Sequence, residues 1–274
     1  MSVFLKENQQ NVDQMSNKSG TLYFLGTGTS QGVPVIGCSC EVCTSQNPKD
    51  SRSRSSVHIV FNGIHLQIDA GPDFRQQMID AGLTHVDAVL FTHEHQDHIA
   101  GLDDTRPIIF RTGNEMLIYA QQRVINRIKK VYDYAFEPQQ YPGAPRIHAT
   151  YIDDGQKFSV RGVQIQSLPV IHGRLPILGY RVGGLAYLTD TNFIPESTYD
   201  LLKDLEVLVI DALHHRNHFS HYTLEQAIEQ AKEIGAKRTY FIHMSHYMGL
   251  HEAISSKLPE NMFLSFDGLE IQFD

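Results

Sequence analysis

The chain has 274 residues, of which 41% are hydrophobic and 20% are charged, and its formal net charge is −8. This composition is that of a globular protein with a sizeable core, and no apolar run reaches the roughly 20 residues of a membrane-spanning helix. Because proteins that grip long nucleic acid usually carry a basic face, the acidic balance disfavours long nucleic acid as a partner.

Residues 1–20 are polar and rich in Asn, Gln and Ser. They lack the basic start and the apolar stretch of a signal peptide. We expect this segment to be a disordered tail, residues 21–274 to form a single domain, and the protein to be cytoplasmic with no membrane partner.

Short runs of apolar and β-branched residues predict strands, and apolar residues at helical spacing predict helices. The predicted strands are 21–25, 57–61, 64–69, 86–91, 117–120, 158–160, 163–168, 178–182, 185–189, 207–210, 239–242, 262–265 and 269–273. The predicted helices are 73–81, 121–131, 196–203, 224–234 and a short one over 100–105 that Arg106-Pro107 limits. We expect residues 132–146 to be an irregular loop. Strands and helices alternating in both halves predict a layered α/β architecture around two sheets.

A dense group of metal-binding side chains follows the predicted strand 86–91. The chain there reads His93-Glu94-His95-Gln96-Asp97-His98. Imidazole and carboxylate together suit zinc, manganese or iron. The pairs His93/His95 and Asp97/His98 can point at two neighbouring metals.

Further His and Asp residues recur at the ends of other predicted strands. They are Asp69, His172, Asp190 and His243. Functional side chains gather where strands end and loops begin. One such histidine would be an ordinary structural residue, but the series in this order indicates a shared site.

In this order, the residues resemble the metallo-β-lactamase superfamily of binuclear metallohydrolases. The resemblance implies an αβ/βα four-layer sandwich, in which two mixed sheets are flanked by helices and the metals lie at one edge. It implies that Asp190 bridges both metals and that Asp69 supports the ligands from behind. The remaining ligands that it assigns are His93, His95 and His172 for one metal, and Asp97, His98 and His243 for the other.

Two divalent metals, zinc or manganese, about 3.5–4 Å apart would generate a hydroxide nucleophile at neutral pH and stabilise both reacting oxygens. Many true β-lactamases have a cysteine where this chain has Asp190, and all three cysteines here lie far upstream. Aspartate at this position is typical of the phosphodiesterase and hydrolase branches, so we discount β-lactam turnover.

The three cysteines, Cys38, Cys40 and Cys43, form a CxCxxC cluster. An odd count crowded into six residues argues against a disulfide framework and favours a separate structural zinc. Three thiolates need a fourth ligand, and His246, three residues after His243, offers one.

This cluster narrows the resemblance to the PhnP-like branch, which contains a phosphoribosyl cyclic phosphodiesterase. The matching segments are Leu25-Gly26-Thr27-Gly28, Gly32-Val33-Pro34, Gly37-Cys38, Gly101-Leu102-Asp103-Asp104 and His243-Met244-Ser245-His246. The branch implies a Cys3His structural zinc beside the active site and usually a homodimer. One departure is Ile242, where many members have threonine.

His221 matches the position at which this branch has a histidine near the leaving group. It could protonate the leaving oxygen, a step that typically contributes about 10²- to 10⁴-fold. The alternative is that His221 caps or packs the following helix. His218 is the second candidate acid, and Arg216 could contact a phosphate or form a surface ion pair. We assign no role to His214 and His215.

The leading interpretation is a binuclear phosphodiesterase that cleaves a small, cyclic phosphodiester. Alternatives are a tRNA 3′-processing endonuclease, a thioester or lactone hydrolase, and a non-catalytic zinc protein that binds partners. The acidic charge and the absence of an obvious inserted arm disfavour the endonuclease, and the filled ligand positions disfavour the non-catalytic protein.

Overall fold

A computed structural model describes residues 19–137 and 141–274 of the chain. The predicted tail, residues 1–20, therefore lies outside the described residues except at its end, where the first strand already begins at Gly20. Part of the predicted loop 132–146 also lies outside them. Within the described ranges, no helix is long and apolar enough to span a membrane.

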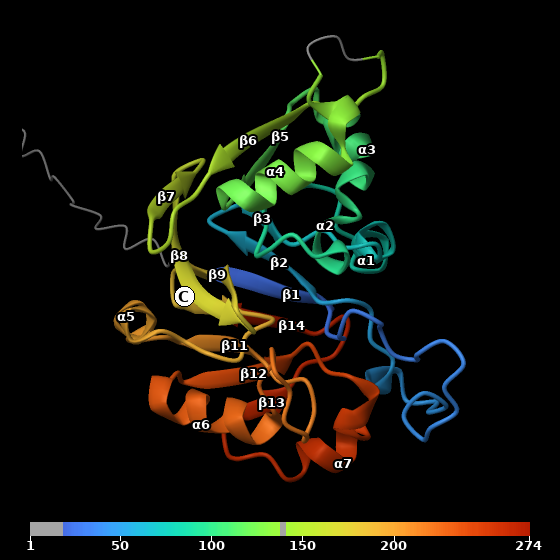
Figure 1. The fold of residues 1–274 in the computed structure, drawn as a ribbon, viewed down its shortest axis with the longest axis vertical. Helices are drawn as coiled ribbons and strands as arrows, with labels where there is room; N and C mark the ends of the chain where they lie inside the picture. The colour runs from blue at the N-terminus through green and yellow to red at the C-terminus, as the bar shows by residue number, and fades with distance from the viewer. Residues whose placement is uncertain (1–18, 138–140) are drawn as a thin grey trace, which may run out of the picture.

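Two sheets of seven strands face each other (Figure 1). The first has the order β14-β1-β2-β3-β4-β5-β6 and the second the order β13-β12-β11-β10-β9-β8-β7. The strands of the first sheet are β1 (Gly20–Gly26), β2 (Ser56–Phe61), β3 (Ile64–Ile68), β4 (Ala88–Leu90), β5 (Met116–Ala120), β6 (Ile147–Tyr151) and β14 (Glu270–Phe273). Those of the second are β7 (Lys157–Val160), β8 (Val163–His172), β9 (Leu175–Val182), β10 (Leu185–Leu188), β11 (Val207–Asp211), β12 (Arg238–Ile242) and β13 (Met262–Leu264).

Helices cover the outer face of each sheet. The first sheet carries α1 (Phe74–Asp80), α2 (Gln96–Ile99), α3 (Arg106–Thr112) and α4 (Gln122–Val131), and the second carries α5 (Glu196–Tyr199), α6 (Leu224–Ile234) and α7 (His251–Ser255). Short 3-10 helices cover Pro48–Asp50, Leu102–Thr105, Asp133–Ala135, Asp200–Leu202 and His246–Met248. This arrangement confirms the predicted four-layer sandwich.

Side-chain alternation along the strands builds three apolar layers. In β11, Val207 and Val209 pack between the two sheets, while Leu208 and Ile210 pack under α6 on the outer face. Because successive side chains of a strand point to opposite faces, a strand covered on both sides is a continuous apolar run. Such runs are the clearest sequence signals in this chain.

Several local predictions were wrong for identifiable reasons. A helix was expected to end before Arg106-Pro107, but α3 begins there. Proline is tolerated in the first turn of a helix, where its missing N–H would have no partner. β8 runs through Pro169 to His172, well past the predicted end at 168. This is possible because β7 pairs only with residues 163–166 of β8, which leaves one side of Pro169 without a strand neighbour.

Besides α3 and some of the short 3-10 helices, three elements had no prediction, namely β6, α7 and the short helix α2 inside the His-rich segment. β6 lies at the edge of its sheet and has no fully buried residue, so its apolar pattern is weak. The helices α2 and α7 have four and five residues, too few to show a helical period.

Strand direction places the ends of many strands at one edge of the sandwich. β3 and β4 are parallel to each other, as are β10, β11 and β12. β8 is antiparallel to β9, which is antiparallel to β10, so β8 and β10 run the same way. The carboxyl ends of these strands therefore meet where the two sheets face each other.

Candidate metal centre

The predicted ligands gather at this shared edge. Asp69 directly follows β3, His172 ends β8, Asp190 lies two residues after β10 and His243 directly follows β12. His93 lies three residues after β4, and Asp97 and His98 are in α2. Residues as far apart in sequence as His98 and His243 thus become neighbours.

Three of these residues have a backbone conformation that side chains rarely adopt. The φ angle is 59° at Asp69, 54° at Asp190 and 65° at His243. Left-handed conformations at non-glycine residues cost on the order of 1–3 kcal/mol and cluster at functional sites. These three unusual backbone conformations therefore lie at the strand ends where the predicted ligands gather.

The first group contains His93, His95 and His172, whose ligand nitrogens lie within 4.8 Å of one another. His93 Nε2 is 3.0 Å from His95 Nδ1, and Thr92 Oγ1 lies 2.9 Å from His93 Nδ1. His172 Nδ1 is 3.0 Å from the Ser220 carbonyl oxygen, which orients the ring. Burial lowers the pKa of His93 and of His172, so both rings are neutral and offer a lone pair.

The second group contains Asp97, His98, Asp190 and His243. Asp190 Oδ2 is 3.4 Å from His98 Nε2, 3.2 Å from His243 Nε2 and 3.9 Å from His93 Nε2 of the first group. Asp97 Oδ2 is 3.2 Å from His98 Nε2. Ligand atoms of a tetrahedral zinc ion lie about 3.3–3.6 Å apart, given metal–ligand bonds of about 2.0–2.2 Å. The spacing therefore fits a shared cation, and Asp190 touches both groups.

Buried polar atoms without partners support the same fit. Among the described residues, His98 Nε2 and both ring nitrogens of His243 are buried with no hydrogen bond of acceptable geometry. Burial disfavours the charged form of His98, yet Asp190, Asp97 and Asp69 raise its pKa well above the usual range. Burial likewise opposes ionisation of Asp190, yet His243 and His98 hold its pKa well below the usual range. A cation would satisfy the Nε2 atoms of His98 and His243 and the buried carboxylates together.

Asp69 lies behind the ligands and does not join either group. Its Oδ2 is 2.7 Å from His98 Nδ1, and its two oxygens accept hydrogen bonds from the N–H and hydroxyl of Thr92. The carboxylate is fully buried. It orients the His98 ring, and through Thr92 it also steadies His93.

Asp211 is a residue of the site that sequence reasoning missed. It ends β11 and is fully buried. Its Oδ1 is 3.2 Å from His221 Nδ1 and 3.4 Å from His243 Nδ1, while Oδ2 accepts the Tyr222 N–H at 3.0 Å. Burial raises its pKa to about 6, against the lowering effect of His221. The sequence feature that could have identified Asp211 is a carboxylate at the end of an apolar strand, which is also how Asp69 was identified.

His221 lies beside the metal-binding groups and does not cap the helix. Its ring stacks on that of His243 at a centroid distance of 4.6 Å and lies 4.8 Å from that of His172. Burial would lower its pKa, but Asp211 raises it above the usual value. The cap of α6 is Thr223, which forms a capping box with Gln226. Its Nδ1 faces Asp211 Oδ1 at 3.2 Å, and the ring also lies within ligand distance of His172 and Asp190.

The other polar residues of this loop lie farther out. His218 is exposed, and its ring centroid is 5.1 Å from that of His221. The guanidinium of Arg216 lies over the Tyr247 ring at 5.4 Å. His214 Nδ1 accepts the Arg216 N–H, and His215 pairs with Glu225. Neither histidine joins the metal-binding groups.

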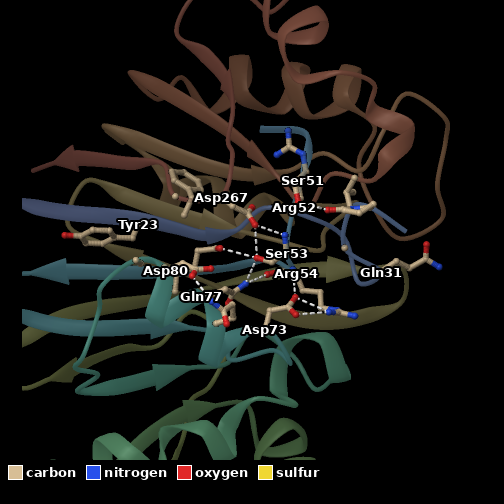
Figure 2. A pocket seen from close by; sticks show the side chains of 18 of the residues that line it. Tyr23, Gln31, Ser51, Arg52, Ser53, Arg54, Asp73, Gln77, Asp80 and Asp267 are labelled. Atoms are coloured by element: carbon tan, nitrogen blue, oxygen red, sulfur yellow. Dashed lines mark hydrogen bonds and ion pairs between the residues drawn. The ribbon is translucent and has the colours of Figure 1, made fainter. Parts of the chain in front are cut away.

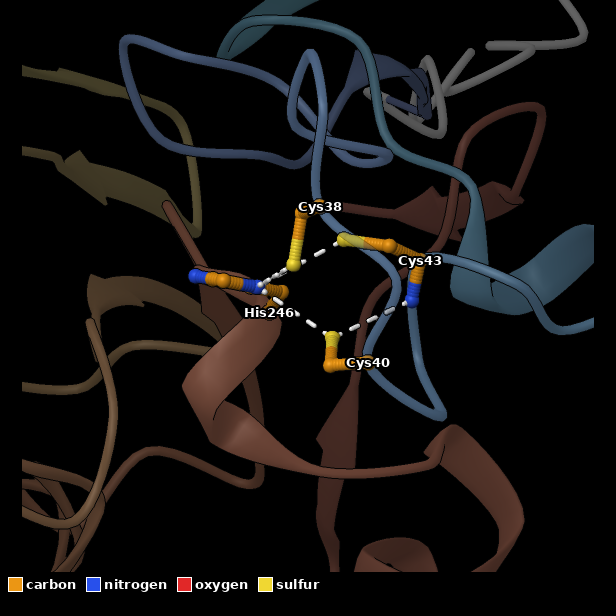
Figure 3. A group of neighbouring side chains, drawn as sticks. All are labelled: Cys38, Cys40, Cys43 and His246. Carbon is orange, nitrogen blue, oxygen red and sulfur yellow. Dashed lines mark hydrogen bonds between the residues drawn. The ribbon is translucent and has the colours of Figure 1, made fainter.

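The cysteine cluster meets His246 as predicted by the spacing of the residues (Figure 3). His246 Nδ1 is 3.3 Å from the Sγ atoms of Cys38 and Cys40 and 3.5 Å from that of Cys43. Nitrogen and sulfur ligands of tetrahedral zinc are separated by about 3.5 Å, since the bonds are about 2.0–2.1 Å and 2.3 Å. The Cys43 N–H lowers the pKa of Cys40 to about 6, which favours the thiolate form.

Two surface pockets can be compared as possible openings to the metal-binding groups. A pocket of about 370 Å³ opens directly on His95 and His172 and is lined by Arg174, Leu175, Phe219 and Ser220. A larger pocket of about 780 Å³ lies beside β1 and α1 (Figure 2). Its charged groups are engaged already, since Arg54 pairs with Asp73 at 2.9 Å and Asp267 accepts hydrogen bonds from Ser53 and Thr27. Chemistry at the metal-binding groups therefore belongs to the smaller pocket.

Comparisons with known proteins agree with the fold. The family described as "Beta-lactamase superfamily domain" matches residues 65–244. A crystal structure described as a new diphosphatase from the PhnP family is 39% identical and has a TM-score of 0.87, covering 93% of this chain and 97% of that one. Zinc-bound PqqB from Methylobacterium extorquens (20% identity, TM-score 0.74) and the short form of human tRNase Z (19%, 0.63) share the fold, each over 92% of this chain and 99% and 98% of theirs.

Curated relatives match only part of their own length. An octanoyltransferase from Porphyromonas gingivalis is 42% identical over 91% of this chain, which corresponds to 51% of that protein. Coenzyme PQQ synthesis protein B from Methylobacterium radiotolerans is 31% identical over 41% of this chain and 42% of its own. The chain thus spans about half the length of these curated relatives.

Proposed function

The chain belongs to the β-lactamase superfamily and, within it, to the PhnP family, and from this premise we propose a binuclear metal-dependent phosphodiesterase that acts on a small, cyclic phosphodiester. The observation that carries the proposal is Asp190. Its Oδ2 lies within 3.9 Å of His93 Nε2 in one group and within 3.4 Å of His98 and His243 in the other.

The proposed ligands follow from the two groups. His93, His95 and His172 would hold one divalent metal, Asp97, His98 and His243 would hold the second, and Asp190 would be shared by both. The N/O donor set suits zinc and manganese alike. When bound, such a pair supplies a hydroxide nucleophile at neutral pH and stabilises developing negative charge. Cys38, Cys40, Cys43 and His246 hold a structural zinc.

The protein's own groups complete the proposed reaction. The pocket beside His95 and His172 admits the substrate, and His221 gives a proton to the leaving oxygen. Asp211 raises the pKa of His221 after burial has lowered it, so the ring retains the proton that this step needs. Asp69 orients His98 by its far nitrogen at 2.7 Å, and the Asp211 carboxylate faces the far nitrogen of His243 at 3.4 Å, so both Nε2 atoms face inward.

A diphosphate is the second candidate substrate. The reason is the PhnP-family diphosphatase, which is 39% identical over nearly the whole of both chains. The octanoyltransferase name describes a protein about twice as long, so acyl transfer carries less weight here. The likeness to tRNase Z is one of fold alone, and the net charge of −8 still disfavours long nucleic acid. Thioesters, lactones and a non-catalytic role in binding zinc and partners remain as outcomes of the test.

The test is hydrolysis of bis(p-nitrophenyl) phosphate and of a nucleoside diphosphate by protein loaded with zinc or manganese. We expect turnover of the diester that a chelator removes and added metal restores. Asp190→Ala should lower kcat at least about 10³-fold, while Asp80→Ala on the exposed side of α1 should leave it unchanged. If the loaded protein cleaves only thioesters or lactones, or nothing, the proposal is wrong.

We also propose that the protein is a homodimer. The support is Ile36, which lies next to the cysteine cluster and is fully exposed although apolar. Light scattering after gel filtration should give twice the mass of the chain, and Ile36→Glu should shift it towards the monomer. A monomeric wild-type protein at micromolar concentration would contradict this.

A further inference from the structure

The two carboxylate oxygens of Asp190 have different surroundings. Oδ2 is the oxygen that lies 3.9, 3.4 and 3.2 Å from the Nε2 atoms of His93, His98 and His243. Oδ1 instead accepts a hydrogen bond from the Thr189 hydroxyl at 2.7 Å. Among residues 19–137 and 141–274, this hydroxyl is the only hydrogen-bond donor to Oδ1. The residue that precedes Asp190 therefore distinguishes one of its oxygens from the other.

The chemistry of the pair sets the direction of this hydrogen bond. An ionised carboxylate can only accept, so the Thr189 hydroxyl must donate. A hydroxyl that donates to a charged oxygen forms a shorter and stronger bond than one between neutral groups. The separation of 2.7 Å fits such a charge-assisted bond. The hydroxyl proton is therefore committed to Oδ1 and competes with any cation for that oxygen.

Solvent cannot replace the Thr189 hydroxyl. The side chains of Thr189 and Asp190 are both buried, with 1% and 2% of their surface exposed. Inside a protein a hydrogen bond is electrostatically stronger than in water, and a lost donor leaves a buried acceptor unsatisfied. Without the hydroxyl, the partner best suited to Oδ1 is a metal ion bound at the neighbouring ligands.

The backbone on the other side of Asp190 is fixed independently. Thr191 donates its hydroxyl to the carbonyl oxygens of Ile171 and Phe193, at 3.0 and 3.1 Å, and its own carbonyl accepts the Tyr222 N–H at 2.9 Å. Two buried threonines thus flank Asp190. The hydroxyl of Thr191 holds the main chain, whereas that of Thr189 holds the Asp190 side chain.

We propose that Thr189 is a positioning residue of the metal centre, which holds Oδ1 of Asp190 and thereby leaves Oδ2 as the one oxygen that both metals share. Without the hydroxyl, Asp190 would offer one oxygen to each metal. The metals would then lie farther apart, because the carboxylate carbon separates the two oxygens. Thr189 touches neither metal nor substrate and acts only through Asp190. This inference rests on the two-metal centre of the proposed function.

The test compares variants that lack or retain the hydroxyl. Thr189→Val replaces it with a methyl group, and Thr189→Ser retains it. The cysteine cluster keeps its zinc while the binuclear centre is loaded with manganese, so X-ray absorption at the manganese edge reports that centre alone. The separation of the metals should be about 3.5 Å in the wild type and in Thr189→Ser, and about 4 Å or more in Thr189→Val.

Manganese affinity provides a second measurement. Calorimetric titration should show the weaker of the two manganese ions bound about 10- to 100-fold less tightly in Thr189→Val, which is the usual effect of losing a group that orients a metal ligand. Thr189→Ser should stay within threefold of the wild type. Thr189→Ala also lacks the hydroxyl and should behave as Thr189→Val does, which keeps the test available if valine does not fit.

Thr191→Val is the matched control. It removes a buried threonine hydroxyl on the other side of Asp190, one that donates to main-chain carbonyls. This variant should lower Tm but keep the manganese affinity and the separation of the metals. The role of Thr189 is overturned if Thr189→Val keeps both properties, if Thr189→Ser loses them as well, or if Thr191→Val loses them to the same extent.

Kinetics separate this inference from the proposed function. With bis(p-nitrophenyl) phosphate and saturating manganese, Thr189→Val should lower kcat about 10- to 100-fold and leave KM within twofold, while Thr189→Ser restores kcat. If the metal measurements change as expected but the wild type cleaves no phosphodiester, the proposed function is wrong and the role of Thr189 stands. If the wild type cleaves the diester but Thr189→Val binds manganese as the wild type does, only the role of Thr189 is refuted.

Discussion

The substitution Asp211→Asn tests the support behind the metal-binding groups most directly. The carboxylate of Asp211 has two acceptor oxygens, and the structure uses both. Oδ2 accepts the Tyr222 N–H at 3.0 Å, and Oδ1 faces His221 Nδ1 at 3.2 Å and His243 Nδ1 at 3.4 Å. Asparagine has the same shape but one acceptor oxygen and one NH₂ donor. One of the two sides must therefore lose its acceptor.

Either orientation of the amide disturbs the site. If the oxygen keeps the Tyr222 N–H, the NH₂ group faces both imidazoles, and each must move its proton to Nε2. For His243 this is the atom that lies 3.2 Å from Asp190 Oδ2 and is the proposed metal ligand. If the amide flips, the buried Tyr222 N–H meets a donor and loses its partner.

The expected size of the effect follows from the group that is lost. Removing the partner that orients a ligating histidine typically costs about 10- to 100-fold in metal affinity, or about 1.4–2.8 kcal/mol. Loss of the correctly protonated His221 should lower kcat further, by about 10²- to 10⁴-fold. We therefore expect Asp211→Asn to bind the second metal weakly and to remain nearly inactive even when metal is in excess.

The assay measures metal content at buffered free zinc and kcat with bis(p-nitrophenyl) phosphate. Asp87→Asn is a matched control, because Asp87 is a nearly buried carboxylate at the far end of β4 that pairs with His85 and Arg161. It should retain both metals and full turnover. If Asp211→Asn keeps wild-type zinc affinity and a kcat within threefold, the supporting role of Asp211 is refuted.

Three further predictions concern other parts of the molecule. Cys40→Ser should remove one zinc per chain and lower Tm while the binuclear centre keeps its metals; elemental analysis and calorimetry check this, and an unchanged zinc content would contradict it. Gly71→Ala should lower Tm and metal content together, because its Cβ would lie 2.0 Å from the Asp97 carbonyl oxygen; Gly155→Ala, with no atom within 4 Å of its Cβ, should keep its metals. Burial lowers the pKa of His58 to about 3. The unfolded chain therefore takes up a proton on His58 at a higher pH than the folded protein does. As a result, the free energy of unfolding falls as the pH drops from about 6.5 towards 3, by about 1.4 kcal/mol per pH unit. Denaturant unfolding at pH 7 and pH 5 should show this loss reduced by about 2 kcal/mol in His58→Gln, and an identical loss in both proteins would argue against it.

The amino-acid sequence by itself determined the chemistry of the ligands and most of the fold. The ligands of the His93–His98 segment could be recognised because they lie close together in the sequence. The other candidates could be recognised because each lies at the end of an apolar strand; they are Asp69, His172, Asp190 and His243. Two-sided burial makes β4, β11 and β12 continuous apolar runs, which is why their ends could be located. Length and pattern alone could not reveal β6, which has no buried residue, or α2 and α7, which are too short to show a period.

Only the tertiary structure decided which of these residues act together. Parallel strands bring their carboxyl ends to one edge, so Asp211 meets His221 and His243 although nothing local in the sequence marks it as their partner. The same packing places His246 against cysteines more than 200 residues away. Such contacts depend on strand direction, register and turn geometry, which local propensity and spacing do not specify. The residue types could therefore be recognised in the sequence, whereas the contacts that support the ligands arise only from the three-dimensional arrangement.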